Sequence, residues 1–245
     1  MFIYSNAFLV QSRCGRLVIL CYRGTEPTNA SNWLTDADAA PEPIPLAAST
    51  GGQSVTVHGG FYRNVRATRL QVVRELALAA RGRSLLDPDE KTDHPLEALY
   101  VTGHSLGGAM AVLFALTSPQ ERLRAVYTFG QPMVAGQPLP PAAEELGRKL
   151  FRHVAPRDPV PALPPASWGA FAHFGQEFQH SEGGWAPVAE PTAQMASLRE
   201  ISRSVLAFLV GGSRRETSRH SIDAHGPHRY LDTLRAAGRV TAFGD

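Results

Sequence analysis

The sequence is poor in cysteine. Only Cys14 and Cys21 occur in its 245 residues, and an apolar segment that predicts a strand lies between them. Seven residues of strand separate two Cα atoms by roughly 23 Å, whereas a disulfide requires less than about 7 Å. We therefore expect no bridge between these cysteines, and two thiols alone make no metal site.

An excess of charge and a long apolar run are also lacking. Lys and Arg number 24 against 22 Asp and Glu, which gives a net charge of +2 and argues against an electrostatically driven nucleic-acid binder. The apolar run at residues 205–210 is too short for a transmembrane segment. The first residues show neither the basic region nor the apolar stretch of a signal peptide. Localisation therefore stays open between the cytoplasm and export after loss of a signal.

The chain has enough apolar residues for a packed core. It is 43% hydrophobic and 19% charged, and we expect residues 1–245 to form a single α/β domain. Strands alternate with helices, which indicates right-handed crossovers onto a parallel sheet. The patterns predict strands at 8–10, 16–22, 55–57, 96–102, 125–129 and 150–154, and helices at 62–82, 108–116, 142–149 and 198–209. We expect 24–52 and 183–194 to be irregular, and a last helix from Pro227 with Tyr230, Leu231 and Leu234 on its inner side.

Ser105 is the candidate nucleophile. It is the central residue of Gly103-His-Ser-Leu-Gly107, between an apolar strand and an apolar helix. This context is typical of a nucleophile elbow, in which a sharp turn lifts the hydroxyl above the sheet. The N–H of Leu106 would then point from a helix N-terminus toward developing negative charge. The alternative interpretation is a glycine-rich turn with an ordinary serine.

Seven motifs along the chain resemble those of the fungal-type, or class 3, lipases. They follow the family order and extend over roughly residues 8–235. They are Val18–Thr25, Asn32–Asp36, Val57–Phe61, Val101–Ala109, Tyr127–Pro132, Asp158–Pro161 and His225-x-x-x-x-Tyr230. The resemblance implies the α/β-hydrolase fold, with a mixed, mostly parallel central sheet flanked by helices and with a short lid. From the motifs, we expect the N-terminal helix that many members carry before the first strand to be missing, as in a minimal or truncated member.

The resemblance also implies the two partners of Ser105. Asp158 matches the family aspartate by position, although an aspartate before Pro159 is also a common turn residue. Of the nine histidines, His225 is preferred as the base, because Pro227 suits a first helical position and leaves His225 in the loop before the helix. His220 and His228 are the alternatives, with His228 preferred of the two. The other histidines are expected elsewhere: His58, His153 and His173 in internal hydrogen bonds, His94 and His180 in irregular surroundings, and His104 with its side chain pointing away from the nucleophile.

Thr25 matches the second oxyanion residue of the family, beside Leu106. The segment at about 26–40 resembles the family lid, in which Trp33 and Leu34 would offer an apolar face to lipid. Core packing is the alternative role for Trp33. Exposing apolar area costs roughly 25 cal/mol per Å² in water, so a lid predicts activation at a transient lipid–water interface. Residues such as Met133, Val160, Leu206 and Leu209 are candidates for the acyl groove.

We therefore expect a serine carboxylic ester hydrolase, foremost a triacylglycerol lipase that releases fatty acids from acylglycerols through an acyl-enzyme, with no metal or organic cofactor. Ser105, His225 and Asp158 would form the catalytic triad, with Thr25 and Leu106 as oxyanion donors. The alternatives are a phospholipase A1, an esterase for shorter or aromatic esters, and a non-catalytic lipid-binding module on the same scaffold.

Overall fold

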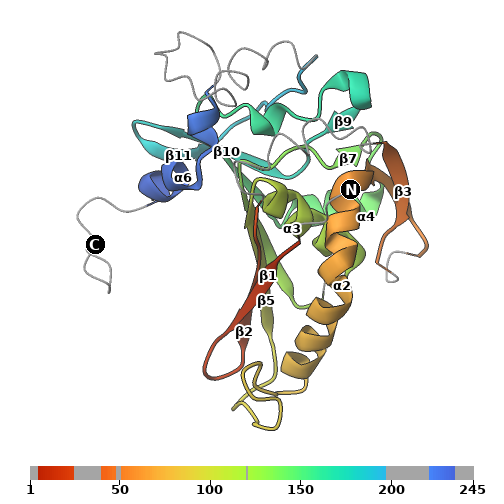
Figure 1. Ribbon diagram of the computed structural model, residues 1–245, viewed down its shortest axis with the longest axis vertical. Helices are drawn as coiled ribbons and strands as arrows, with labels where there is room; N and C mark the ends of the chain where they lie inside the picture. Colours follow the sequence, from red (N-terminus) through yellow and green to blue (C-terminus); the bar gives the residue numbers. More distant parts are fainter. Residues whose placement is uncertain (1–4, 25–39, 48–50, 120, 197–220, 235–245) are drawn as a thin grey trace.

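A seven-stranded sheet forms the centre of the protein (Figure 1). The computed structural model describes residues 5–24, 40–47, 51–119, 121–196 and 221–234. The five inner strands are parallel, and the two edge strands are antiparallel to their neighbours. In spatial order the strands are β1 (Ala7–Gln11), β2 (Leu17–Tyr22), β5 (Ala98–His104), β6 (Leu123–Phe129), β8 (Leu150–Val154), β10 (Gln176–Ser181) and β11 (Gly184–Pro187).

A smaller antiparallel sheet lies beside it, in the order β3 (Pro41–Pro45), β4 (Ser54–His58), β7 (Ala135–Gly136) and β9 (Phe171–Ala172). Strand β3 corrects our expectation that 24–52 is irregular throughout. Its three prolines occupy alternate positions, so the N–H groups that they lack would all fall on one side of the strand. An edge strand tolerates this arrangement, and β3 is at the edge of its sheet.

The helices α2 (Gly59–Ala80), α3 (Leu106–Thr117) and α4 (Pro141–Gly147) lie on one side of the large sheet, and α6 (Pro227–Leu234) lies on the other (Figure 1). Every residue of α3 is buried, as expected for a helix that is apolar on all sides. Short 3₁₀ turns occur at η2 (Val160–Ala162), η3 (Ala166–Trp168) and η5 (Ile222–His225). The main core therefore lies where α3 packs between the sheet and α2.

The predicted strands and helices occur within a few residues of their expected bounds, as far as they lie in the described residues. Helix α2 begins three residues earlier than predicted, because His58 caps it by accepting the N–H of Phe61 on Nδ1. Residues 183–194 are not wholly irregular, since β11 pairs with β10 there. The predicted helix at 198–209 lies outside the described residues.

Our expectation that Tyr230, Leu231 and Leu234 all lie on the inner side of the last helix is also wrong in part. Tyr230 is buried, but Leu231 is 55% and Leu234 45% exposed. The hydroxyl of Tyr230 hydrogen-bonds inside the protein, and this anchor places the two leucines on the outer side of a short helix. Cys14 and Cys21 are free thiols. Among the described helices, none has the length and apolar character needed to cross a membrane.

Candidate active site

Ser105 lies in a sharp turn between β5 and α3. Its backbone has φ 58° and ψ −128°, a conformation that costs a residue other than glycine of order 1–3 kcal/mol. Close backbone packing keeps the turn in place: a Cβ on Gly107 would lie 2.2 Å from the carbonyl oxygen of Tyr22, and one on Gly103 would lie 2.2 Å from Gly107. Only glycine at these two positions lets strand, turn and helix approach so closely.

Ser105, His225 and Asp158 form one hydrogen-bonded series. Nε2 of His225 lies 2.8 Å from Oγ of Ser105, and Nδ1 lies 3.0 and 2.9 Å from Oδ1 and Oδ2 of Asp158. Ser105 and Asp158 are each 5% exposed, and the His225 side chain is 13% exposed. Since the carboxylate only accepts, Nδ1–H of a neutral His225 donates to it and leaves Nε2 to accept the serine proton. This arrangement can activate a hydroxyl for nucleophilic attack.

Asp158 is held by further donors that sequence reasoning missed. Its Oδ1 accepts the N–H of Val160 at 2.9 Å, and its Oδ2 accepts the hydroxyl of Tyr230 at 2.5 Å. The Tyr230 oxygen in turn accepts the N–H of Ala155 at 3.0 Å. Burial, followed by the negative charge of Asp158, raises the pKa of Tyr230 well above its ordinary value, so its proton stays in this hydrogen bond. The motif His225-x-x-x-x-Tyr230 indicated that Tyr230 belongs to the site, but it did not identify Asp158 as the hydrogen-bond partner of Tyr230.

Gly130 lies directly against the pair formed by Asp158 and His225. It follows β6 with φ +57°, and a Cβ there would lie 2.7 Å from Oδ2 of Asp158 and 2.9 Å from the His225 ring. Its N–H donates to the carbonyl oxygen of His153 at 2.9 Å. The backbone at Gly130 therefore forms a wall of the site that has no room for a side chain.

The side chain of His104 lies against His225. Its Nε2 is 2.8 Å from the carbonyl oxygen of His225, and the two ring centroids are 4.6 Å apart. Our expectation that this side chain points elsewhere holds for the serine hydroxyl, since no hydrogen bond joins them in the described structure, but it overlooked the contact with His225. The turn therefore brings two consecutive side chains to the same histidine: Ser105 contacts Nε2 of His225, and His104 contacts its ring and its carbonyl oxygen.

The predicted oxyanion donors are only partly in the described structure. Leu106 is the first residue of α3, where the N–H groups lack partners within the helix. Thr25 lies outside the described residues, but a Cβ on its neighbour Gly24 would lie 3.4 Å from Cβ of Ser105. Trp33, Leu34 and lid residues 26–39 also lie outside the described residues, as do Leu206 and Leu209. Met133 and Val160 are buried.

The remaining histidines lie in other surroundings. His228 is 59% exposed at the side chain and pairs with Asp223 at 3.6 Å, away from Ser105. His58 and His173 make internal hydrogen bonds as expected. In His153, Nδ1 is buried without a partner, and the ring stacks on Phe129 and Phe178. His180 lies in β10 rather than in an irregular segment.

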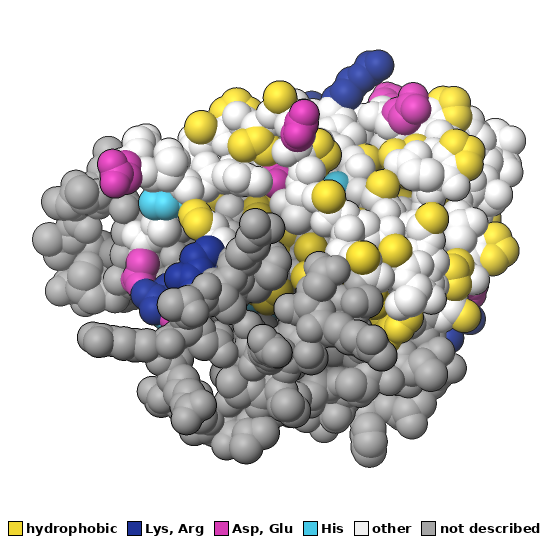
Figure 2. All heavy atoms as spheres, turned by 90° about the horizontal axis from the view of Figure 1, so that it is seen from above, with side chains coloured by type: hydrophobic (Ala, Val, Ile, Leu, Met, Phe, Trp, Pro, Cys, Tyr) yellow, Lys and Arg dark blue, Asp and Glu magenta, His cyan; other side chains and the backbone are white. Residues whose placement is uncertain are grey.

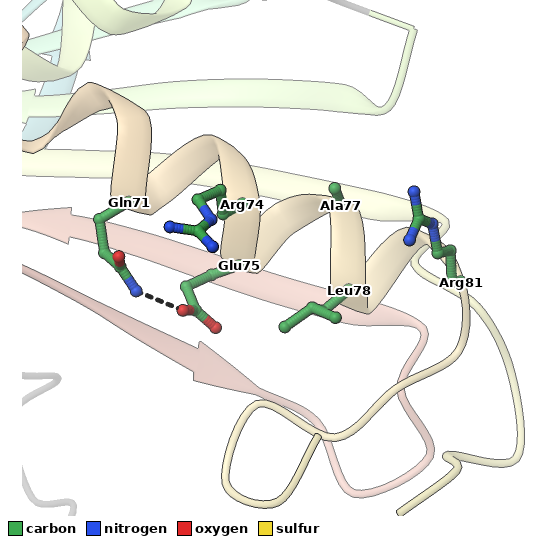
Figure 3. Close-up of a pocket in the computed structure, with 6 residues that line it drawn as sticks. All are labelled: Gln71, Arg74, Glu75, Ala77, Leu78 and Arg81. Carbon is green, nitrogen blue, oxygen red and sulfur yellow. Dashed lines mark hydrogen bonds between the residues drawn. The ribbon is translucent and has the colours of Figure 1, made fainter. Parts of the chain in front are cut away.

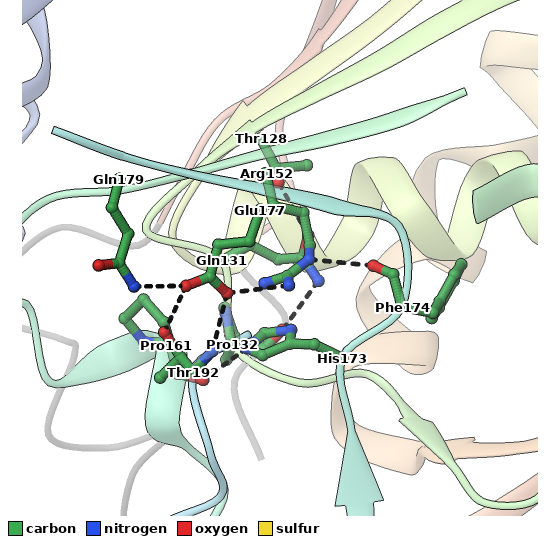
Figure 4. Close-up of polar contacts among 10 residues, drawn as sticks. All are labelled: Thr128, Gln131, Pro132, Arg152, Pro161, His173, Phe174, Glu177, Gln179 and Thr192. Atoms are coloured by element: carbon green, nitrogen blue, oxygen red, sulfur yellow. Dashed lines mark hydrogen bonds and ion pairs between the residues drawn. The ribbon is translucent and has the colours of Figure 1, made fainter. Parts of the chain in front are cut away.

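A buried ion pair supports the loops near the site (Figure 4). Arg152 of β8 and Glu177 of β10 are 2.9 Å apart, with both side chains 1% exposed. Nε of Arg152 donates to the carbonyl of Phe174, and Glu177 accepts from Gln179 and Thr192. Nearby, Nε2 of His173 donates to the carbonyl of Pro161 at 2.7 Å. These bonds tie the segment that follows Asp158 to the sheet.

A hollow of about 410 Å³ lies on the outer surface of α2 (Figure 3). Its lining residues lie in the C-terminal half of the helix, among them Gln71 and Arg74, and include Arg81, which caps the helix. In the view from above, the described part of the surface has hydrophobic side chains interspersed with polar and charged ones (Figure 2). Among the described residues, no group of three or more His, Cys, Asp or Glu side chains could hold a metal ion.

Several known proteins are similar to this chain in sequence. A family model described as Lipase (class 3) matches residues 19–168. A lipase of Rhizomucor miehei is 29% identical over 210 residues, which cover 83% of this chain and 52% of that protein. A triacylglycerol lipase of Ricinus communis is 26% identical, with 96% of this chain and 56% of that protein covered. The chain thus spans about half the length of the curated relatives it matches.

The fold is also found among solved structures. The triacylglyceride lipase of Rhizomucor miehei superposes with a TM-score of 0.58 at 24% identity, over 92% of this chain and 76% of that one. The architecture is therefore the α/β-hydrolase fold, with a mixed, mostly parallel sheet and helices on both of its faces, as the sequence predicted.

Proposed function

Because the chain belongs to the class 3 lipase family, we propose that it is a serine hydrolase of carboxylic esters that acts on acylglycerols, foremost triacylglycerols. The observation that carries this proposal is the 2.8 Å contact between Oγ of Ser105 and Nε2 of His225, together with the contact of Nδ1 with Asp158. A hydroxyl, a base and an orienting carboxylate in this order are the parts required for acyl transfer.

In the first half of the reaction, Oγ of Ser105 attacks the ester carbonyl carbon while Nε2 of His225 takes the serine proton. Asp158 holds Nδ1–H and stabilises the imidazolium that forms. The tetrahedral oxyanion accepts the N–H of Leu106, with Thr25 as the second predicted donor. The imidazolium then gives its proton to the leaving alcohol, and the C–O bond breaks to leave an acyl-enzyme.

Water completes the cycle. His225 removes a proton from a water molecule as its oxygen attacks the acyl carbon, and the serine oxygen recovers that proton as the fatty acid leaves. No electron donor or metal enters either half. The residues of this chain supply each proton transfer, and the buried position of Asp158 keeps its charge directed at the histidine.

The choice of acylglycerols rests on the relatives. Those with matching sequences include proteins named triacylglycerol lipase, and others named secreted mono- and diacylglycerol lipase. These names are consistent with glycerol esters of fatty acids as the substrate class.

A hydrolysis panel tests the proposal. Rates on p-nitrophenyl esters of increasing chain length, and on triolein, diolein, phosphatidylcholine and a feruloyl ester, are compared for the wild type and S105A. We expect the wild type to hydrolyse long-chain glycerol esters. In S105A the rate should be lower by several orders of magnitude. Preference for phosphatidylcholine or the feruloyl ester would replace acylglycerols with a phospholipase A1 or an aromatic esterase.

Covalent labelling separates an enzyme from a lipid-binding module. An activated serine reacts with a fluorophosphonate, and mass spectrometry then finds the adduct on the Ser105 peptide. We expect one adduct in the wild type and none in S105A. A wild-type chain that binds lipid but neither forms the adduct nor hydrolyses an ester would be a non-catalytic module.

A further inference from the structure

His104 joins the strand of the nucleophile to the backbone of the base. It is the last residue of β5, paired with Phe129 of β6, and the N–H of the following Ser105 donates to the Phe129 carbonyl at 2.9 Å. The backbone of His104 is therefore fixed by the centre of the sheet. Its side chain extends from this fixed point to His225, 121 residues further along the chain.

The contact defines which nitrogen of His104 carries a proton. Nε2 lies 2.8 Å from the carbonyl oxygen of His225, and a carbonyl oxygen only accepts, so Nε2–H donates. The ring also packs on the His225 ring, with centroids 4.6 Å apart and an angle of 31° between the planes. His104 thus touches both the backbone and the side chain of the base, without a hydrogen bond to Oγ of Ser105 in the described structure.

Apart from the bond from His104 and the contact of His225 with the Ser105 hydroxyl, the described bonds from this segment to the rest of the protein lead to Asp158 and its loop. The N–H of Ser221 donates to the carbonyl of Arg157, and the hydroxyl of Tyr230 bonds to Asp158 and Ala155. These contacts fix residues 221–234 relative to the loop that holds Asp158. Within the described residues, the bond from His104 is the one that fixes the backbone of His225 relative to β5, the strand that ends directly before Ser105.

We propose that His104 is a positioning residue that sets the distance across which the proton moves between Ser105 and His225. This positioning role rests on the proposed function, because it concerns the proton transfer at that same site. A general base must lie within about 2.6–3.2 Å of the atom it deprotonates, and small displacements from that geometry are costly in rate. The hydrogen bond from His104, at the end of β5, to the backbone of His225 limits such displacement.

The charge of His104 suits this role. Burial, followed by the neighbouring His225, lowers the pKa of His104 to about 4, so its ring is neutral near pH 7. A neutral ring adds no positive charge against the imidazolium that forms on His225 during each turnover. The bond to the carbonyl needs only the Nε2–H of the neutral form.

Two substitutions separate the hydrogen bond from the ring packing. H104F keeps an aromatic ring but has no donor, whereas H104Q replaces the ring with an amide whose Nε2 has a similar reach. We expect H104F to lower kcat by about tenfold with KM changed less than about twofold, and H104Q to retain kcat within about threefold of the wild type. H94F and H94Q, in the loop at the far end of the sheet, are the matched controls and should leave kcat unchanged.

The outcomes are distinct. Full kcat in folded H104F, or H104Q no better than H104F, overturns the positioning role, because the donor would then not matter. A wild type that hydrolyses no ester overturns the proposed function, and the role of His104 with it. An active wild type with an unaltered H104F overturns the role of His104 alone.

Nitrogen-15 NMR of the wild type tests the same contact without a substitution. We expect the ring of His104 to be the neutral Nε2–H tautomer between pH 6 and 8, and the low-field Nδ1 proton of His225 to be observed beside it. The Nδ1–H tautomer, or a protonated ring, would overturn the proposal even if H104F fails to fold.

Discussion

The hydroxyl of Tyr230 lies 2.5 Å from Oδ2 of Asp158 and accepts the N–H of Ala155 at 3.0 Å. One oxygen therefore fixes the position of the carboxylate and satisfies a backbone donor. Tyr230 is 2% exposed, so water cannot readily replace either bond. The tyrosine thus ties α6 to the loop that follows β8, where Asp158 is placed to face His225.

Removal of this hydroxyl should weaken both folding and the site. In Y230F, the N–H of Ala155 loses its partner and Asp158 loses a donor, and each buried loss of this kind costs about 1–3 kcal/mol. We expect the free energy of unfolding in urea to fall by about 2–6 kcal/mol for the two losses together, and kcat to fall by about tenfold. Y127F is the control, because Tyr127 is 38% exposed on the sheet face. Equal stability of Y230F and wild type would contradict the prediction.

A side chain at Gly130 should disrupt the contact between Asp158 and His225. In G130A the new Cβ would lie 2.7 Å from Oδ2 and 2.9 Å from the His225 ring, so one of them must move. We expect kcat to fall at least a hundredfold, measured on a p-nitrophenyl ester. G51A is the matched control: Gly51 also has a positive φ, of +70°, but nothing lies within 4 Å of its Cβ. If both variants lose activity equally, backbone strain and not collision is responsible.

The buried ion pair of Arg152 and Glu177 should be costly to break. E177Q leaves the Arg152 charge without a counter-ion where both side chains are 1% exposed, and such a change costs about 3–5 kcal/mol. E97Q breaks the pair of Arg16 and Glu97 at 3.6 Å, whose side chains are 53% and 52% exposed, and should cost less than about 1 kcal/mol. Urea unfolding of both variants measures the difference, and similar losses would show the prediction to be wrong.

Burial of His58 should make stability depend on pH. Burial and the nearby Arg63 lower the pKa of His58 to about 4, from about 6.5 in the unfolded chain. Between these values the unfolded chain binds more protons, so this contribution to stability is complete above pH 6.5 and is lost as the pH falls toward 4. His58 is 3% exposed, which prevents solvent from relieving the cost.

The substitution H58N removes this titration and keeps a side-chain acceptor for the N–H of Phe61 at the start of α2. We expect the slope of unfolding free energy against pH between 4 and 6.5 to decrease by up to about 1.4 kcal/mol per pH unit. Loss of the ring stack on Phe61 lowers stability at all pH values and leaves the slope alone. An unchanged slope would mean that His58 is already protonated or accessible in the folded protein.

Local pattern was sufficient for most of the long helices and strands and for the turn at Ser105. Alternation between apolar strands and helices predicted the order from β4 to β8 apart from the short strand β7, because the apolar pattern of a strand or a helix face depends on residues close together in the chain. The turn at Ser105 was predictable for the same reason, since Gly103 and Gly107 lie within two residues of it. Strand β3 was missed because its prolines are ordinarily a signal against a strand, and only its place at a sheet edge makes them acceptable.

The sequence by itself indicated the class 3 lipase motifs, the strand-turn-helix around Ser105, and Asp158 and His225 as candidate partners of this serine. Only the tertiary structure decided that these three meet, that Tyr230 bonds to Asp158, and that His104 bonds to His225. Ser105 and His225 are 120 residues apart, and no periodic pattern specifies a contact over that separation. Such contacts depend on how the sheet packs and where each loop ends, and these are set by the burial of the whole core.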